Sequence, residues 1–220
     1  GGDFFYSRRI GQEVRFDENE FLSSNEELVV YDKKPNLINA VKFSGTTNNK
    51  LSIGLLNAIT DEVNATIRNI EDGSVRKENL VPVTNYNVIS LTQQLLNDYS
   101  SIGLHNANVN RSKGGLNANN TVFVTDLYDN KRDFNFSSRF YFSNAPRLSE
   151  KNGFRGSFSI EELKGNVQFM AGWIGTDRYY NQNELGYYNE QNNQRAYARI
   201  RYQIFEEYKM LRNYSNYLYV

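Results

Sequence analysis

The sequence alternates between apolar and polar residues over long stretches, and this alternation most restricts the possible fold. One stretch carries phenylalanine at four alternating positions: Phe134, Phe136, Phe140 and Phe142. In another, residues 196–204, alanine, isoleucine and tyrosine alternate with polar residues that include Arg199 and Arg201. Successive side chains of a β-strand point to opposite faces of a sheet. Both stretches are therefore predicted to be strands with one apolar and one polar face.

These predicted strands are longer than those of most soluble domains, which run to about five or six residues. A strand that crosses a bilayer has about nine to eleven residues, with apolar side chains toward lipid and polar ones toward a lumen. Every backbone group in a bilayer needs a partner, and a closed barrel provides one. The pattern predicts an all-β fold, a transmembrane antiparallel up-and-down β-barrel. Residues 1–220 are predicted to form one barrel domain or a fragment of one, with a long connection at 61–81.

The composition agrees with a sheet that has one face exposed to water. Mean hydropathy is −0.66, yet the chain holds 16 tyrosines and 14 phenylalanines. A polar lumen explains the low hydropathy, and the abundant aromatics exclude a disordered chain. Aromatic side chains at the ends of segments are predicted to form the girdles found at membrane interfaces. The candidates are Phe4, Phe5, Tyr6, Tyr141, Phe142, Tyr179, Tyr180, Tyr187 and Tyr188.

Several functional classes are excluded or disfavoured. The absence of cysteine excludes disulfide scaffolds and zinc–thiolate sites. The 25 Lys and Arg balance 25 Asp and Glu, so no nucleic-acid partner is expected. His105 is the one histidine and has no evident partners for a catalytic triad or metal site. Acidic residues around Asp17 and Asp129 do not match a calcium-binding loop. We therefore expect no enzyme activity, metal or cofactor.

The alternation also assigns candidate residues to two faces. The predicted lipid-facing residues are Phe134, Phe136, Phe140, Phe142, Ile200 and Ile204. The predicted lumen-facing residues are Arg8, Arg9, Arg199, Arg201 and Gln203. Charged residues inside membrane proteins are usually paired, so a carboxylate from a neighbouring strand is the expected partner of Arg8 or Arg9. The alternative is a basic site that steers anions.

Short motifs spread along the chain carry a resemblance to a known family. They are 5–11 (Phe-Tyr-Ser-Arg-Arg-Ile-Gly), 37–42, 51–62, 81–86, 101–104, 109–111 and 183–187. Together they resemble Bacteroidota outer-membrane proteins in which a family-9-like carbohydrate-binding β-sandwich precedes a barrel domain of unknown function. The resemblance implies a pore, transporter or membrane anchor in the bacterial outer membrane, linked to carbohydrate binding or uptake. It implies contact with membrane lipid, and with polysaccharide or other outer-membrane proteins.

The family barrel is longer than 220 residues, so this chain is expected to be an incomplete portion of a larger barrel. Two alternatives stay open. A soluble β-sandwich that binds glycans also has strands with one buried and one wet face. A structural subunit of an envelope or secretion complex would use the sheet as a scaffold.

Overall fold

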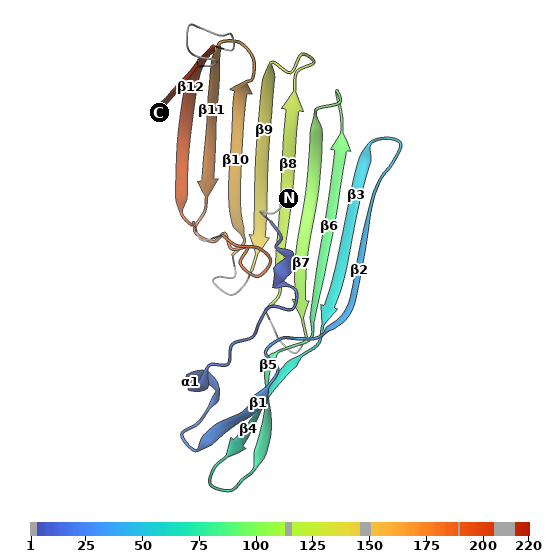
Figure 1. Ribbon diagram of the computed structural model, residues 1–220, viewed down its shortest axis with the longest axis vertical. Coiled ribbons are helices and arrows are strands. Elements are labelled where there is room, and N and C mark those ends of the chain that lie inside the picture. Colours follow the sequence, from blue (N-terminus) through green and yellow to red (C-terminus); the bar gives the residue numbers. More distant parts are fainter. Residues whose placement is uncertain (1–3, 113–115, 146–150, 189, 205–213) are drawn as a thin grey trace.

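The computed structural model describes residues 4–112, 116–145, 151–188, 190–204 and 214–220. Most of these residues belong to one large antiparallel sheet, in which the strands lie side by side (Figure 1). From one edge to the other its strands are β2 (Leu37–Thr46), β3 (Leu51–Thr60), β6 (Thr84–Gln94), β7 (Ser101–Arg111), β8 (Ala118–Tyr128), β9 (Phe134–Asn144), β10 (Gly153–Glu162), β11 (Val167–Thr176), β12 (Asn193–Ile204) and β13 (Tyr214–Tyr219). The prediction of an all-β chain with antiparallel strands is confirmed.

The large sheet is open rather than closed. Within the described residues, β2 pairs only with β3 and β13 pairs only with β12, so both remain edge strands. No closed barrel is therefore found in the described part of the chain, which was predicted to be an incomplete portion of a larger barrel. The physical reason is that closure needs hydrogen bonds between the two edges, and none joins β2 to β13.

A second, smaller sheet lies beyond one end of β2, β3 and β6 (Figure 1). It has the order β1 (Glu26–Tyr31), β4 (Val63–Asn69) and β5 (Val75–Val81). The prediction of a long connection at 61–81 was wrong, because β4 and β5 form a hairpin there. Alternating apolar residues of β4 are buried, and the Asp72 carboxylate accepts the Ser74 amide at 2.8 Å in the turn.

Two short helical turns precede β1, namely η1 (Ser7–Arg9) and α1 (Glu18–Phe21). The Asp17 side chain accepts the Asn19 amide at 3.0 Å and so caps the start of α1. Neither helix among the described residues has the length and apolar character that crossing a membrane requires.

One face of the large sheet is partly covered by two other segments, and we call it the covered face. The N-terminal segment, residues 4–12, and the 177–188 loop lie across it. Phe4, Phe5 and Leu185 pack on small and apolar side chains of β3, β6, β7 and β8. The Tyr6 amide donates to the Leu185 carbonyl at 2.7 Å, which joins the two segments to each other. Apolar burial and backbone hydrogen bonds therefore hold this cover in place.

Several aromatic residues predicted to form membrane girdles belong to this cover instead. Tyr141 and Tyr180 are buried against each other with ring centroids 6.3 Å apart. Tyr188 packs edge-on against Tyr180 at 5.4 Å. The girdle assignment was wrong for Tyr141 and Tyr180, because the 177–188 loop folds back on the sheet and buries both side chains.

The small sheet is expected to loosen in acid. Arg76 donates to both carboxylate oxygens of Glu26, at 2.8 and 3.0 Å, and holds the pKa of Glu26 at about 2 instead of 4.5. A carboxyl whose pKa is lowered by folding stabilises the fold above its unfolded pKa, and this stabilisation is lost as the pH falls through the folded pKa. We expect amide exchange in β1, β4 and β5, corrected for intrinsic rates, to accelerate between pH 4.5 and pH 2.

Arg76→Gln should weaken this acid dependence, since it removes the largest cause of the lowered Glu26 pKa and leaves only Ser23, whose amide lies 3.0 Å from Glu26 Oε2, to lower it. Arg68→Gln is the matched control, because Arg68 makes a single 3.3 Å contact with Glu27 on the same sheet. Acid loosening that is as large in Arg76→Gln as in the unmodified protein would contradict the assignment.

Candidate functional site

The face opposite the cover, which we call the open face, is lined by large apolar side chains in rows that cross the strands. In one row the register aligns Leu91, Leu104, Phe123 and Phe140. In another it aligns Phe136, Ile160, Ala171 and Ala198. No described segment packs over these rows as the N-terminal segment does on the covered face. Many of their side chains are exposed.

All six residues predicted to face lipid lie on the open face. The second row contains Phe136 and Ala198, so the alternation places Ile200 and Ile204 on the same side as the phenylalanines. Exposed fractions are 42% for Phe134, 53% for Phe142 and 51% for Ile200. Phe140 is less exposed than these residues, because the ring of Phe154 stacks on it with centroids 6.1 Å apart. An apolar face of this extent is rare on a soluble monomer.

The apolar rows end at a row of asparagines near the small sheet. The register aligns asparagines from five successive strands: Asn57, Asn87, Asn108, Asn119 and Asn144. Their amides bond to one another and to neighbouring asparagines; Asn57 Nδ2 donates to Asn87 Oδ1 at 2.8 Å and Asn106 Nδ2 to Asn119 Oδ1 at 3.1 Å. These bonds satisfy much of the amide hydrogen-bonding capacity along one border of the apolar surface.

The arginines of β12 lie on the covered face, beyond the area that the cover occupies. Arg199 forms an ion pair with Glu161, and Arg201 donates to the side chain of Gln168. Gln203 shares this face by alternation. The carboxylate partner of Arg199 lies two strands away, on β10.

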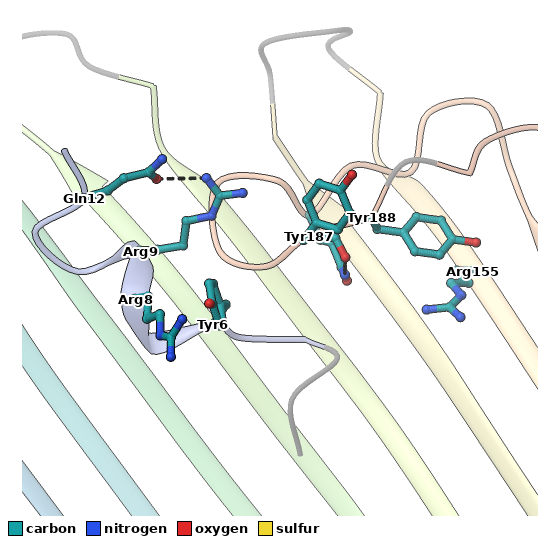
Figure 2. Close-up of a pocket in the computed structure, with 8 residues that line it drawn as sticks. Tyr6, Arg8, Arg9, Gln12, Arg155, Tyr187 and Tyr188 are labelled. Carbon is teal, nitrogen blue, oxygen red and sulfur yellow. Dashed lines mark hydrogen bonds between the residues drawn. The ribbon is translucent and has the colours of Figure 1, made fainter. Parts of the chain in front are cut away.

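Arg8 and Arg9 lie in η1 on the cover rather than on a strand. They contribute to a pocket of about 800 Å³ between the N-terminal segment, the 177–188 loop and β10 (Figure 2). Positive, aromatic and amide side chains from these three segments line the pocket. They are Tyr6, Arg8, Arg9, Gln12, Arg155, Gln182, Tyr187 and Tyr188. This grouping depends on the folding of the cover and was not predicted from the sequence.

Two of the pocket arginines are held in defined positions. Arg9 donates to the Gln12 side chain and to the Gly186 carbonyl, both at 2.9 Å. The Arg155 guanidinium lies over two rings, 4.3 Å from the centroid of Tyr188 and 4.9 Å from that of Tyr141. Stacking on an aromatic face leaves the N–H edge of a guanidinium available to a ligand. Sequence reasoning missed Arg155, because only the folded loop shows its closeness to Tyr188.

His105 and the acidic clusters offer no comparable site. His105 Nδ1 lies 2.7 Å from Ser90 Oγ on the neighbouring strand, and its ring packs 5.4 Å from that of Phe4. The Asp129 carboxylate accepts backbone amides of Lys131, Asp133 and Phe134, which lowers its pKa and closes a turn. Within the described residues no group of three or more His, Asp or Glu side chains is arranged to hold a metal ion.

Comparison with known proteins identifies a family but no function. The family model described as "Domain of unknown function (DUF5916)" matches residues 1–220. No curated protein and no solved structure matches the chain.

Proposed function

Because this chain belongs to the DUF5916 family of unknown function, we propose a function from its structure: it forms part of the wall of a bacterial outer-membrane β-barrel. The barrel acts as a pore, transporter or membrane anchor. The open face meets lipid, and the covered face lines the interior. The observation that carries this proposal is the exposed apolar surface that extends over the strands of the large sheet.

The dimensions of the open face support this placement. On β9 the stretch from Phe134 to Phe142, whose open face carries four phenylalanines and Ser138, spans about 26 Å at about 3.3 Å per residue. At a strand tilt of about 40° this is about 20 Å of height, close to the apolar band of about 25 Å in outer-membrane barrels. The asparagine row then falls at one border of the band, where amides that bond to each other and to water are tolerated.

Under this proposal the two edge strands, β2 and β13, require pairing partners. An unpaired sheet edge in lipid leaves backbone donors and acceptors without partners, at a cost of several kcal/mol for each group. The edges of β2 and β13 must therefore pair with further strands in the membrane. On this proposal the ten strands are one arc of the wall. The N-terminal segment and the 177–188 loop, which lie on the covered face, partly fill the interior.

Membrane partition of the full-length protein tests the proposal. We expect the protein in the outer-membrane fraction of bacterial cells, resistant to alkaline carbonate and extracted only by detergent. Recovery in the aqueous fraction without detergent would overturn the proposal and favour a soluble, glycan-binding β-sandwich whose second layer covers the open face. Carbonate-sensitive membrane recovery would also overturn it and indicate a subunit held on an envelope complex by other proteins.

A further inference from the structure

The pocket on the cover concentrates positive charge without acidic groups to balance it. Arg8, Arg9 and Arg155 line it, and none of the described residues that line it is an aspartate or glutamate. Figure 2 shows Arg8 and Arg9 on one side and Arg155 on the other, with Tyr187 between them and the Tyr188 ring beside Arg155. The pocket therefore offers two separate positive groups to a single ligand.

Two carboxylates of the 177–188 loop bond to groups other than the pocket arginines. The Asp177 carboxylate accepts the backbone amides of Phe154, Tyr179 and Tyr180, at 2.7–2.9 Å. Glu184 forms an ion pair of 2.7 Å with Arg111, at the end of β7. Glu190, which is exposed, lies 3.5 Å from the Tyr188 hydroxyl. The structure thus gives Arg8, Arg9 and Arg155 no ion pair within the described part of the chain.

Arg8 and Arg9 have N–H donors without an acceptor in the part of the chain that the structure describes, which indicates that a ligand could bind them. Arg9 Nε is buried and has no hydrogen-bond acceptor among the described residues, although an unsatisfied buried donor of a charged group is costly. Arg8 lies 5.8 Å from the Tyr6 ring, and its side chain makes no hydrogen bond to any residue that the structure describes. Guanidinium groups bind carboxylate and phosphate through paired N–H···O bonds. Tyr187 is 73% exposed and offers a ring face beside them.

We propose that this pocket binds an anion that presents two or more carboxylate or phosphate groups. One group binds at Arg8 and Arg9, and another at Arg155, while the tyrosines contact the body of the ligand. This inference goes beyond the proposed barrel, because the pocket is built from this chain alone and does not depend on how the open face is covered.

Calorimetry on the full-length protein tests the pocket with three probes. The probes are tetragalacturonate, its fully methyl-esterified form and inorganic pyrophosphate. We expect one or both anions to bind and the neutral ester not to bind. Affinity should fall with added salt, since partly exposed charges are screened. Binding of tetragalacturonate alone identifies carboxylates as the ligand groups, and binding of pyrophosphate alone identifies phosphates.

Variants connect this binding to the named arginines. Arg8→Gln and Arg155→Gln should each weaken anion binding about 10- to 100-fold, the usual effect of losing a charged hydrogen bond. Arg155→Lys keeps the charge but loses the planar group that stacks between rings, so it should restore binding only in part. The matched control is Arg178→Gln, since Arg178 stacks on Tyr179 in the same loop but does not line the pocket.

Two outcomes overturn the inference: no binding by either anion, or equal binding by the acid and its ester. Unchanged affinity in both Arg8→Gln and Arg155→Gln also overturns it. None of these results depends on the partition test. A protein that fails to enter membranes can still bind the anion in buffer, and a membrane protein can fail to bind it in detergent.

Discussion

Phe136→Arg is expected to lower the free energy of unfolding in lipid vesicles by about 2–4 kcal/mol, the cost of arginine near the middle of a bilayer. Phe136 lies within the apolar run of β9, is 40% exposed and aligns with Leu127 and Ile160 on the open face. In water the same change at an exposed site would cost less than about 0.5 kcal/mol. Urea unfolding of the protein and its variant in lipid vesicles measures this cost and distinguishes the value expected in lipid from the value expected in water.

Ser137→Arg is the matched control for this experiment. Ser137 is the next residue on β9, faces the opposite side and shares a hydrogen bond of 2.9 Å with Ser159. Its arginine would enter the polar interior, so the cost should stay below that of Phe136→Arg. Equal costs at the two positions would show that the assignment of the faces to lipid and interior is wrong.

Gly153→Ala is expected to lift the 177–188 loop from the sheet while β9 and β10 stay paired. A Cβ at position 153 would lie 2.2 Å from the Tyr180 Cα and 2.4 Å from its amide nitrogen. These are backbone atoms, so a change of rotamer cannot relieve the clash. Overpacking typically costs about 1–3 kcal/mol, which corresponds to about a 5- to 150-fold larger equilibrium constant for opening of the loop.

Hydrogen exchange at the Asn181 amide measures this opening, because that amide donates to Ser143 Oγ at 2.9 Å only when the loop is seated. Gly54→Ala is the control, since its Cβ would meet Ser90 Cβ at an ordinary 3.5 Å. The loop also forms the pocket, so Gly153→Ala should weaken anion binding. An unchanged Asn181 exchange rate would mean that the loop is not held against Gly153.

The strands and their faces could be predicted largely from the sequence. Strand periodicity is a local property, so the alternation at Phe134–Phe142 and at residues 196–204 was enough to place β9 and β12. The same alternation put Arg199 and Arg201 opposite Ile200. It failed at residues 61–81, where the buried residues of β4 alternate over a short strand and the second to fourth residues of the next strand are charged.

Contacts between distant segments were decided only by the tertiary structure. The sequence determined which side chains share a face of a strand, because the two-residue period fixes this without any partner. It did not determine that Tyr141 and Tyr180 would be buried together, that β2 and β13 would remain edges, or that Arg155 would lie near Arg8 and Arg9. Each of these depends on where the 177–188 loop, the N-terminal segment and the sheet edges lie in space. Side-chain packing and hydrogen bonds between residues far apart in the chain set those positions.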